Sequence, residues 1–458
     1  MEPTTQLLPP WLWGAATSAF QVEGSPLADG AGPSNWYVFT HTPGKVRGGH
    51  TADVACDHYR RFPEDVGLMR QLGLQAYRFS LAWGRILPEG RGRINTRGLD
   101  FYQRLVDQLL EAGVQPMVTL FHWDLPWELE RQGGWANPAT VEAFAHYGQV
   151  VFRALGDRVR LWVTLNEPWV VMDAGYVHGV HPPGRREPAV AVRVAHHLLL
   201  AHARAVQVGR AQGVGAVGLV VNLEPKHPGG EREEDRQAAQ RAHTYNNRLF
   251  LDPLFFGRYP EDVEEAFGTP WPEELCCQVE QVRGSLDFLG INYYTRSVLV
   301  HDPQAPPPKV RRLPPLAEAS TTMGWEIYPQ GLGETLHWVA HQYPKVPLLV
   351  TENGAAFADP PPGGGRVADQ RRVRFLREHI QQVLAARAQG VDVRGYFLWS
   401  LLDNFEWTEG YFQRFGVVYV DFASQQRTIK DSGWFYRQVI ASDGRLLQHS
   451  FTFPSGDR

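Results

Sequence analysis

The sequence contains very little cysteine. Its three cysteines, Cys56, Cys276 and Cys277, are spread over a chain of 458 residues. An odd number, with two of them adjacent, is not a disulfide framework, and no C-x-x-C pairs provide the spacing of a zinc site. Few and unpaired cysteines are typical of proteins in reducing compartments. We therefore predict a cytoplasmic protein that has no structural disulfides and no metal site.

The sequence also has no surplus of positive charge. Lysine and arginine together number 45, against 49 aspartates and glutamates, and the net charge is -4. Domains that bind nucleic acid usually carry a basic surface, so nucleic acid is not an expected partner. Neither G-x-G-x-x-G nor G-x-x-x-x-G-K-[ST] opens a predicted helix, so a nucleotide fingerprint is missing too.

Long hydrophobic runs are absent as well. No stretch approaches 18 consecutive apolar residues, so we expect no membrane span. The N-terminal stretch MEPTTQLLPPWLWG has no basic segment and no long apolar segment, so we expect no signal peptide. Hydrophobic residues nevertheless make up 43% of the chain and charged residues 21%, which is typical of a soluble globular protein with a large core.

Short apolar segments that end abruptly at polar residues recur along the chain. Eight such segments are residues 12–18, 76–82, 116–121, 161–165, 216–222, 288–293, 348–351 and 395–400. Stretches between them, such as 101–110, 192–208 and 373–388, have apolar residues three and four positions apart, which predicts helices. Eight strands alternating with helices favour parallel strands with right-handed crossovers, and therefore a (β/α)8 barrel of the TIM type.

The chain is longer than a minimal barrel, so long loops must connect some strands to their helices. Candidate loops are residues 34–57, 223–243, 300–322 and 357–369, and the last two are rich in proline and glycine. No linker divides the chain, and no repeat of 20–50 residues is visible. The sequence therefore predicts an α/β fold in which residues 1–458 form a single barrel domain.

Polar and aromatic residues follow nearly every predicted strand. Because the carboxyl ends of all strands meet at one face of a barrel, these side chains should share one site. Amides and carboxylates suit hydroxyl groups, and tryptophan faces suit sugar rings. The residues concerned are Gln21, Arg78, His122, Trp123, Asp124, Asn166, Glu167, Asn292, Tyr293, Tyr294, Glu352, Asn353, Trp399, Asp403, Asn404, Glu406 and Trp407.

Two of these residues, Glu167 and Glu352, directly follow apolar strands and would share the mouth of the barrel. Two carboxyl groups that flank a bond can hydrolyse a glycoside, because one protonates the leaving oxygen while the other attacks the anomeric carbon or activates a water. Each glutamate has another explanation when taken alone. Glu167, followed by Pro168, could cap a helix, and Glu352, followed by Asn-Gly, could belong to a turn.

Structural roles also remain open for the other candidates. Arg78 could form an ion pair in the core. His122 could be a hydrogen-bonded core residue or a metal ligand, although no second ligand stands at metal spacing. Side chains that could simply pack in the core or close hydrogen bonds at the barrel rim are Asn292, Tyr294, Trp399 and Trp407.

Several stretches carry a more specific pattern. They are WGAATSAFQVEG, YRFSLAWGRILPEG, TLFHWDLP, TLNEP, LGINYYTR, VTENG and LWSLLDNFEWTEGY followed by RFGVVYVDF, and they run from residue 13 to 422. Together they resemble glycoside hydrolase family 1, the β-glucosidase family. TLNEP and TENG at this separation are specific, whereas QVEG alone is not. The resemblance implies a (β/α)8 barrel, action on β-glucosides or short β-linked oligosaccharides with retention of configuration, and no cofactor.

The resemblance also implies roles for individual residues. It makes Glu167 the acid/base and Glu352 the nucleophile, with Arg78 and Tyr294 holding the nucleophile, while Asn166 would bond the sugar 2-hydroxyl. Further substrate-binding positions would be Gln21, His122, Glu406 and Trp407 for hydroxyl groups, Trp123 beside them, Trp399 as stacking platform, Asn292 near the nucleophile and Trp325 on the aglycone side. The negative charge of Glu352 should keep Glu167 protonated until Glu352 is glycosylated.

Other functions fit the sequence less well. A 6-phospho-β-glycosidase would place small and basic residues where this chain has Glu406-Trp407, and an ionised carboxylate there would repel a phosphate. A non-catalytic sugar-binding barrel would lack one or both glutamates, and a myrosinase-like enzyme would have glutamine in place of Glu167. Transglycosylation stays open, because a sugar or an alcohol can intercept the same intermediate as water.

One departure from the family pattern is HPPG, in which Pro182 stands where alanine is usual. This segment and the proline-rich residues 303–315 should influence the preference for leaving groups. The sequence therefore predicts an intracellular retaining β-glucosidase with β-galactosidase or β-fucosidase side activity. It does not indicate whether the protein is a monomer or an oligomer.

Overall fold

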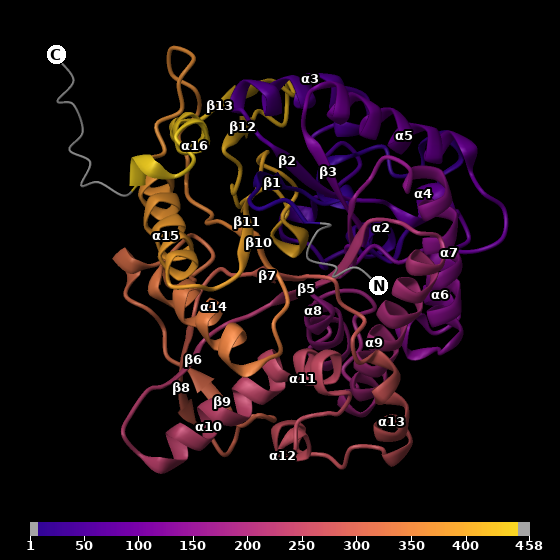
Figure 1. Cartoon of the computed structure of the whole chain (residues 1–458), viewed down its shortest axis with the longest axis vertical. Coiled ribbons are helices and arrows are strands. Elements are labelled where there is room, and N and C mark those ends of the chain that lie inside the picture. Colours follow the sequence, from indigo (N-terminus) through magenta and orange to yellow (C-terminus); the bar gives the residue numbers. More distant parts are fainter. Residues whose placement is uncertain (1–7, 448–458) are drawn as a thin grey trace.

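The computed structural model describes residues 8–447, and its centre is a closed barrel of eight parallel strands (Figure 1). The strands are β1 (Trp13–Ala16), β2 (Ala76–Ser80), β3 (Gln115–Phe121), β4 (Leu161–Asn166), β5 (Ala216–Asn222), β7 (Leu289–Asn292), β10 (Leu348–Asn353) and β11 (Val393–Trp399). They pair in the order β1-β11-β10-β7-β5-β4-β3-β2, so strands consecutive along the barrel are neighbours in space. Each predicted strand overlaps one barrel strand, and the predicted (β/α)8 fold is confirmed.

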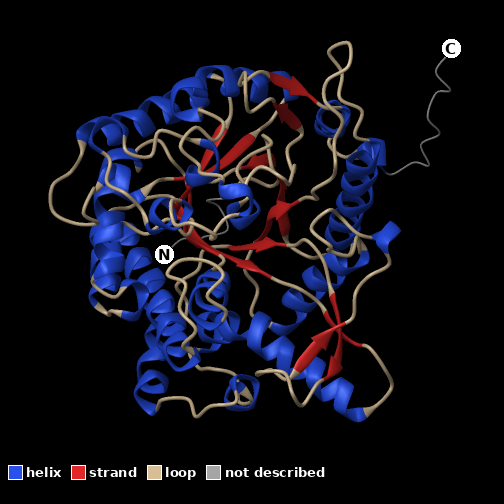
Figure 2. Cartoon of the chain, turned by 180° about the vertical axis from the view of Figure 1, so that it is seen from behind, coloured by secondary structure: helices blue, strands red, loops and turns tan. Residues whose placement is uncertain are grey.

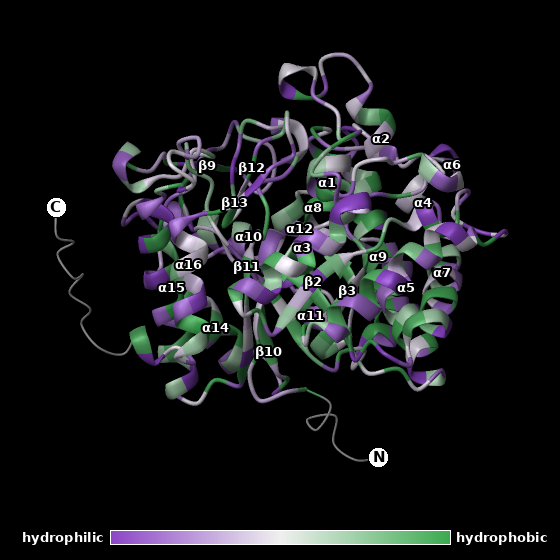
Figure 3. Ribbon diagram, turned by 90° about the horizontal axis from the view of Figure 1, so that it is seen from above, coloured by the Kyte–Doolittle hydropathy of each residue, from purple (hydrophilic) through white to green (hydrophobic). Residues whose placement is uncertain are grey.

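Helices surround this barrel. The long ones are α3 (His58–Leu72), α5 (Thr96–Glu111), α7 (Ala139–Leu155), α9 (Pro188–Ala211), α14 (Gln330–Gln342), α15 (Gln370–Ala388) and α16 (Asp431–Ala441). The three predicted helical stretches lie inside α5, α9 and α15. In α5, the buried residues Phe101, Tyr102, Leu105, Val106 and Leu109 recur at spacings of three and four, so one face packs on the barrel. Hydrophilic and hydrophobic segments accordingly alternate along the outer helices (Figure 3).

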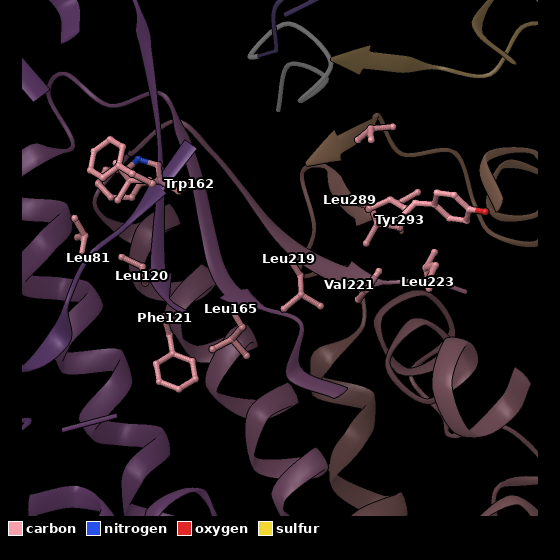
Figure 4. Packing of buried hydrophobic residues seen from close by; sticks show 14 of the residues in the cluster. Leu81, Leu120, Phe121, Trp162, Leu165, Leu219, Val221, Leu223, Leu289 and Tyr293 are labelled. Carbon is pink, nitrogen blue, oxygen red and sulfur yellow. The ribbon is translucent and has the colours of Figure 1, made fainter. Parts of the chain in front are cut away.

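Strand residues alternate between the barrel interior and the layer under the helices. In β4, Leu161 and Val163 belong to the interior cluster, which also contains Met117 and Leu349. Trp162, between them, points outward and packs with residues such as Leu120 in the layer beneath the helices (Figure 4). The interior cluster fills the barrel toward the amino-terminal ends of the strands, so a site is expected at their carboxyl-terminal ends.

Two predicted loops contain regular structure. Residues 223–243 include β6 (Lys226–Pro228) and α10 (Glu233–His243), and residues 300–322 include β9 (Val310–Arg312), which pairs with β8 (Ser297–His301). The prediction that these stretches are loops was wrong. Helix α10 buries mainly alanines, and the strands are short and partly exposed, so neither shows strong apolar periodicity. Strands β6, β8 and β9 form a small sheet apart from the barrel (Figure 2).

The other two predicted loops are mostly irregular. Residues 34–57 contain the short helix α2 (Asn35–Thr40), and residues 357–369 contain one isolated bridge between Gly363 and Arg366. Between residues 8 and 447, no helix is long and apolar enough to cross a membrane. The stretch for which the sequence predicts no signal peptide begins in residues 1–7, outside the described residues.

Candidate active site

A pocket opens at the carboxyl ends of the barrel strands. Eleven of the thirteen residues to which the family resemblance gives a role line it: His122, Trp123, Asn166, Glu167, Asn292, Tyr294, Trp325, Glu352, Trp399, Glu406 and Trp407. The other two, Gln21 and Arg78, are buried behind the lining and contact residues that form it. Five more strand-end residues that were predicted to share the site are buried and do not line it: Asp124, Tyr293, Asn353, Asp403 and Asn404. The structure thus brings together side chains that are up to 386 positions apart, from Gln21 to Trp407.

Bulges in β4 and β10 turn the side chains of Asn166 and Glu352 toward this pocket. From Val163 to Asn166 β4 advances three residues while β5 advances two, and from Val350 to Glu352 β10 advances two while β7 advances one. An extra residue turns the following side chains to the other face of the sheet. Without it, strict alternation from Val163 would direct Leu165, and not Asn166, into the barrel.

Backbone strain contributes at three positions in the lining. Glu167, Trp123 and Trp407 have φ values of 47°, 82° and 48°, a region that side chains with a Cβ rarely adopt. Such strain persists only where surrounding contacts enforce it, and it concentrates at functional sites. Glu167 precedes α8 (Pro168–Met172) at the capping position, but its side chain makes no capping hydrogen bond and lines the pocket instead.

Both oxygens of the Glu352 carboxyl group accept strong hydrogen bonds. Arg78 donates from Nη1 to Oε1 over 2.6 Å, and the Tyr294 hydroxyl donates to Oε2 over 2.6 Å. The ion pair is almost fully buried. Burial raises the pKa of Glu352 above its usual value, and the charge of Arg78 and the hydrogen bond from Tyr294 limit that rise. These donors match the ionised form, because a carboxylate has only acceptors.

Glu167 is equally buried but has no cation bound to it. Its Oε1 accepts a hydrogen bond of 2.6 Å from Nδ2 of Asn292. Burial, followed by the negative charge of Glu352, raises the pKa of Glu167 to about 8. At neutral pH, Glu167 therefore holds a proton while Glu352 is stabilised as an anion. Two carboxyl groups whose surroundings separate their protonation states in this way are suited to act as acid and nucleophile.

Asn166 connects the two carboxyl groups to the rest of the site. Its Oδ1 accepts from Nη2 of Arg78 over 2.6 Å and from Nδ2 of Asn292 over 3.1 Å. Its own Nδ2 lies 3.1 Å from Nε2 of His122. Burial and then the charge of Arg78 hold the pKa of His122 well below its usual value, so this imidazole is neutral and its Nε2 can accept.

Glu406 also lines the pocket, and its carboxyl group is held by Gln21. Nε2 of Gln21 donates to Oε2 of Glu406 over 3.1 Å. Burial and the charge of Glu352 raise the pKa of Glu406 to about 8. Glu406 is therefore mainly protonated at neutral pH, and the argument that its charge repels a phosphate does not hold there. The charges that act on it, from Glu352 and Glu409, are both negative, so it gains no cation that would bind phosphate.

Tryptophans surround the space between these groups. Trp399 and Trp407 stack on His122, with ring centroids 5.8 and 6.0 Å away. Trp123 packs on Trp407 at 4.6 Å, and Trp325 packs on Tyr294 at 5.3 Å. Such rings provide flat apolar surfaces in a pocket whose remaining groups form hydrogen bonds, a combination that suits a sugar ring.

Several lining residues were not predicted from the sequence. They are Trp169, Val170, His181, Asn222, Leu223, Glu224, Thr295, Arg312, Met323, Thr408, Glu409 and Phe415. Asn222 ends β5, so the rule that strand ends face the site would have included it, and its buried Oδ1 has no partner among the described residues. Arg312 reaches the pocket from β9 of the small sheet, and Glu224 lies just before β6. The sequence analysis singled out residues 303–315 as a segment that influences the leaving group, but it did not predict the sheet.

No group of three or more His, Cys, Asp or Glu side chains within residues 8–447 is arranged to hold a metal ion. The reactive groups that line the site are carboxyl groups and their hydrogen-bond donors. A parallel barrel with a protonated and an ionised carboxyl group facing one aromatic pocket defines a glycosidase.

Comparisons with known proteins place the chain within this class. Residues 4–445 match the model of Glycosyl hydrolase family 1, and the chain belongs to this family of enzymes. It is 50% identical over 440 residues to Beta-glucosidase A of Thermotoga maritima, covering 95% of this chain and 97% of that protein. It is 49% identical to a 1,4-beta-D-glucan glucohydrolase of Thermotoga neapolitana, covering 95% and 98%.

Solved structures agree in fold. The family 1 β-glucosidase from Thermotoga maritima superposes with a TM-score of 0.93 at 49% identity, covering 95% of this chain and 98% of that one. The same relative has been solved in complex with glucoimidazole, and that structure superposes with a TM-score of 0.92 over the same shares of the two chains.

Proposed function

We propose that the protein is a retaining β-glucosidase that releases terminal β-D-glucosyl residues from β-glucosides or short β-linked oligosaccharides. The observation that carries this proposal is the contrast between Glu352, which binds Arg78 and Tyr294, and Glu167, whose pKa of about 8 leaves it protonated. The names of the Thermotoga relatives support a glucosyl substrate. The whole activity is assigned to one barrel domain, residues 1–458.

In the first step, the Glu352 carboxylate attacks the anomeric carbon and the bond to the aglycone oxygen breaks. Glu167 donates its proton to that oxygen, so the aglycone leaves as a neutral alcohol. Arg78 and Tyr294 orient the attacking carboxylate and favour its ionised form. The product of this step is a glucosyl ester on Glu352.

In the second step, the ester has removed the negative charge of Glu352. The charge that raised the pKa of Glu167 is then gone, so Glu167 can act as a base. It takes a proton from water, whose oxygen attacks the anomeric carbon and expels the Glu352 carboxylate. The sugar leaves with its original configuration, and Glu167 is again protonated.

The separation of the two carboxyl groups supports retention. The Asn292 amide binds Glu167 over 2.6 Å and also acts to lower the pKa of Glu352. Retaining enzymes hold their two carboxyl groups about 5–5.5 Å apart, closer than inverting ones. Two groups that both respond to Asn292, with Glu167 also responding to the charge of Glu352, are expected at the shorter spacing.

The remaining pocket residues would bind the sugar. Asn166 would bond the 2-hydroxyl, Trp399 would stack on the ring, and Trp325 would contact the aglycone. His122, Glu406 and Trp407, with Trp123 beside them, would hold the other hydroxyl groups, and Gln21 would position Glu406 from behind the lining. β-Galactosidase or β-fucosidase side activity is part of the proposal, and so is a cytoplasmic location, which the free cysteines support.

Proton NMR of the first product tests the proposal. With 4-nitrophenyl β-D-glucoside in D2O, we expect β-glucose to form first and the α-anomer to follow only at the rate of mutarotation in enzyme-free buffer. Release of α-glucose first would contradict retention. Cleavage of the 6-phosphoglucoside in preference to the glucoside would favour the phosphoglycosidase alternative.

A further inference from the structure

The outer wall of the pocket contains an arginine that the proposed mechanism does not use. Arg312, in β9, is the only lysine or arginine among the described residues that line the pocket. Its Nη2 donates to the carbonyl oxygen of Arg296 over 2.6 Å and lies 3.4 Å from Oγ1 of Thr295. Thr295 directly follows Tyr294, which binds Glu352. Strand β9 of the small outer sheet thus presents a guanidinium group to the same pocket that Glu167 and Glu352 line.

The positive charge of Arg312 is not fully balanced by its acidic neighbour. Among residues 8–447, Glu224 is the only acid paired with Arg312, at 3.6 Å, and it also pairs with Lys226 at 3.3 Å. The Ser297 hydroxyl donates to the same carboxylate. Both cations lower the pKa of Glu224, so it is ionised and is shared between Arg312 and Lys226, and Asp173 also acts on Lys226.

The other acids of the pocket do not supply the missing charge. Glu352 and Glu409 are each paired with another arginine, at 2.6 and 2.9 Å. Glu167 and Glu406 have pKa values of about 8 and are mainly neutral between pH 6 and 7. Arg312 therefore remains the one cationic side chain among the described lining residues, and of the ionised acids there only Glu224 is paired with it.

This wall lies on the side from which the leaving group departs. Glu167, which protonates the leaving oxygen, follows β4, and Glu224 follows the neighbouring strand β5. Trp169, Met323 and Trp325 line the same pocket and are only partly buried, so they offer apolar surface to a group bound there. A ring against these side chains would bring a substituent toward the guanidinium group.

We propose that Arg312 is a specificity-determining residue that favours β-glucosides whose aglycone is an aromatic ring bearing a carboxylate. This inference rests on the proposed function and extends it to a substrate class. A guanidinium group binds a carboxylate through charge-assisted hydrogen bonds. Because the Arg312 side chain is 37% exposed, water and salt weaken the interaction, and we expect a preference of about tenfold at low ionic strength.

The test compares two substrates that differ in one charge, 4-carboxyphenyl β-D-glucoside and its methyl ester. The two leaving groups differ in intrinsic reactivity, so the informative quantity is the ratio of their kcat/KM values in each enzyme variant. In Arg312→Gln, we expect the acid-to-ester ratio to fall about five- to tenfold relative to the wild type. Arg312→Lys, which keeps the charge, should retain most of the preference.

Arg311→Gln is the matched control. Arg311 precedes Arg312 in β9, its side chain is 60% exposed, its acidic partner Asp302 is 4.0 Å away, and it does not line the pocket. We expect the ratio of this variant to equal that of the wild type. A ratio unchanged in Arg312→Gln, or reduced equally in Arg311→Gln, would overturn the inference.

A salt titration of the wild type provides a second measurement that needs no variant. Raising NaCl from about 20 to 500 mM should reduce the acid-to-ester ratio several-fold, because exposed charges are screened over shorter distances. A ratio independent of salt would contradict a role for Arg312. If the wild type hydrolyses neither compound, nor 4-nitrophenyl β-D-glucoside, the proposed function fails rather than this inference.

Discussion

The two halves of the pocket are built on different principles. The inner half, with His122, Trp399, Glu406 and Trp407, is buried, stacked and mainly neutral at pH 7. The outer wall, around Arg312, is ionised and partly exposed, and it stands on short strands outside the barrel. In the inner half, His122 and Trp399 stand at the ends of β3 and β11, and Glu406 and Trp407 stand in the segment that follows β11. Arg312 stands on a strand that pairs within the small outer sheet.

Because of this difference, the inner half should determine how fast any β-glucoside is cleaved, and the outer wall should determine which aglycones are preferred. Removing a buried group leaves its partners without hydrogen bonds in a site that excludes water, which is costly. Removing an exposed charge changes a screened interaction, which is worth much less. Substitutions should therefore have large effects on all substrates in the inner half, and small effects on particular substrates at the outer wall.

The largest effect should follow Glu352→Ala. Without the nucleophile no glycosyl ester forms, and we expect kcat for 4-nitrophenyl β-D-glucoside to fall on the order of 10⁵-fold, about 7 kcal/mol in activation free energy. Glu142→Gln, on the exposed face of α7, is the control and should have wild-type activity. Wild-type rates in purified, folded Glu352→Ala would show that the reaction occurs elsewhere.

Glu167→Ala should have an effect that depends on the leaving group. For an alkyl glucoside, which needs the proton, we expect kcat/KM to fall about 10³-fold. For 2,4-dinitrophenyl β-D-glucoside, which leaves without a proton, kcat/KM should stay near the wild-type value. A plot of log kcat/KM against leaving-group pKa measures this, and equal losses for both substrates would argue against Glu167 as the acid.

Glu406→Gln tests the inner half away from the reacting bond. Glutamine keeps the size of the side chain but changes its hydrogen bonds to the sugar and to Gln21. We expect kcat/KM to fall about 10- to 100-fold for every glucoside, whatever its aglycone. A fall in kcat/KM for glucosides of one aglycone only would show that Glu406 contributes to aglycone selectivity, which contradicts the assignment of the inner half to all substrates.

The smallest predicted effect is the change of kcat/KM with pH. Glu167 must be protonated to act as acid, so kcat/KM should decline as the pH rises through about 8. Since the pKa of Glu406 is also about 8, Glu406→Gln identifies the group: its residual activity should keep the alkaline decline. In Glu352→Gln, which removes the neighbouring charge, carbon NMR of the Glu167 carboxyl group should show a lower pKa.

Much of the barrel follows from the sequence because apolar runs that end at polar residues mark buried parallel strands. Arg78 also follows simple alternation, since it lies two positions after the interior residue Ala76. Asn166 and Glu352 do not, because bulges in β4 and β10 shift the alternation directly before them. A bulge depends on the neighbouring strand, so the pattern within one strand cannot reveal it.

The outer wall was predicted only as a proline-rich segment that influences the leaving group, and not as a sheet. Strands β6 and β9 are three residues long and partly to fully exposed, and they form by pairing with β8. Arg312 looks like any charged loop residue until this sheet forms. Gln21 shows the opposite case: its residue type suggested direct contact with a ligand, but the structure places it behind Glu406.

Trapping of the covalent intermediate tests the central claim most directly. A 2-deoxy-2-fluoro-β-D-glucoside with a good leaving group should react and then hydrolyse slowly, because the fluorine destabilises both oxocarbenium-like transition states. Intact mass should rise by one fluoroglucosyl unit, and peptide mapping should place that unit on Glu352. An adduct on another residue, or no adduct on folded enzyme that hydrolyses β-glucosides, would contradict the account.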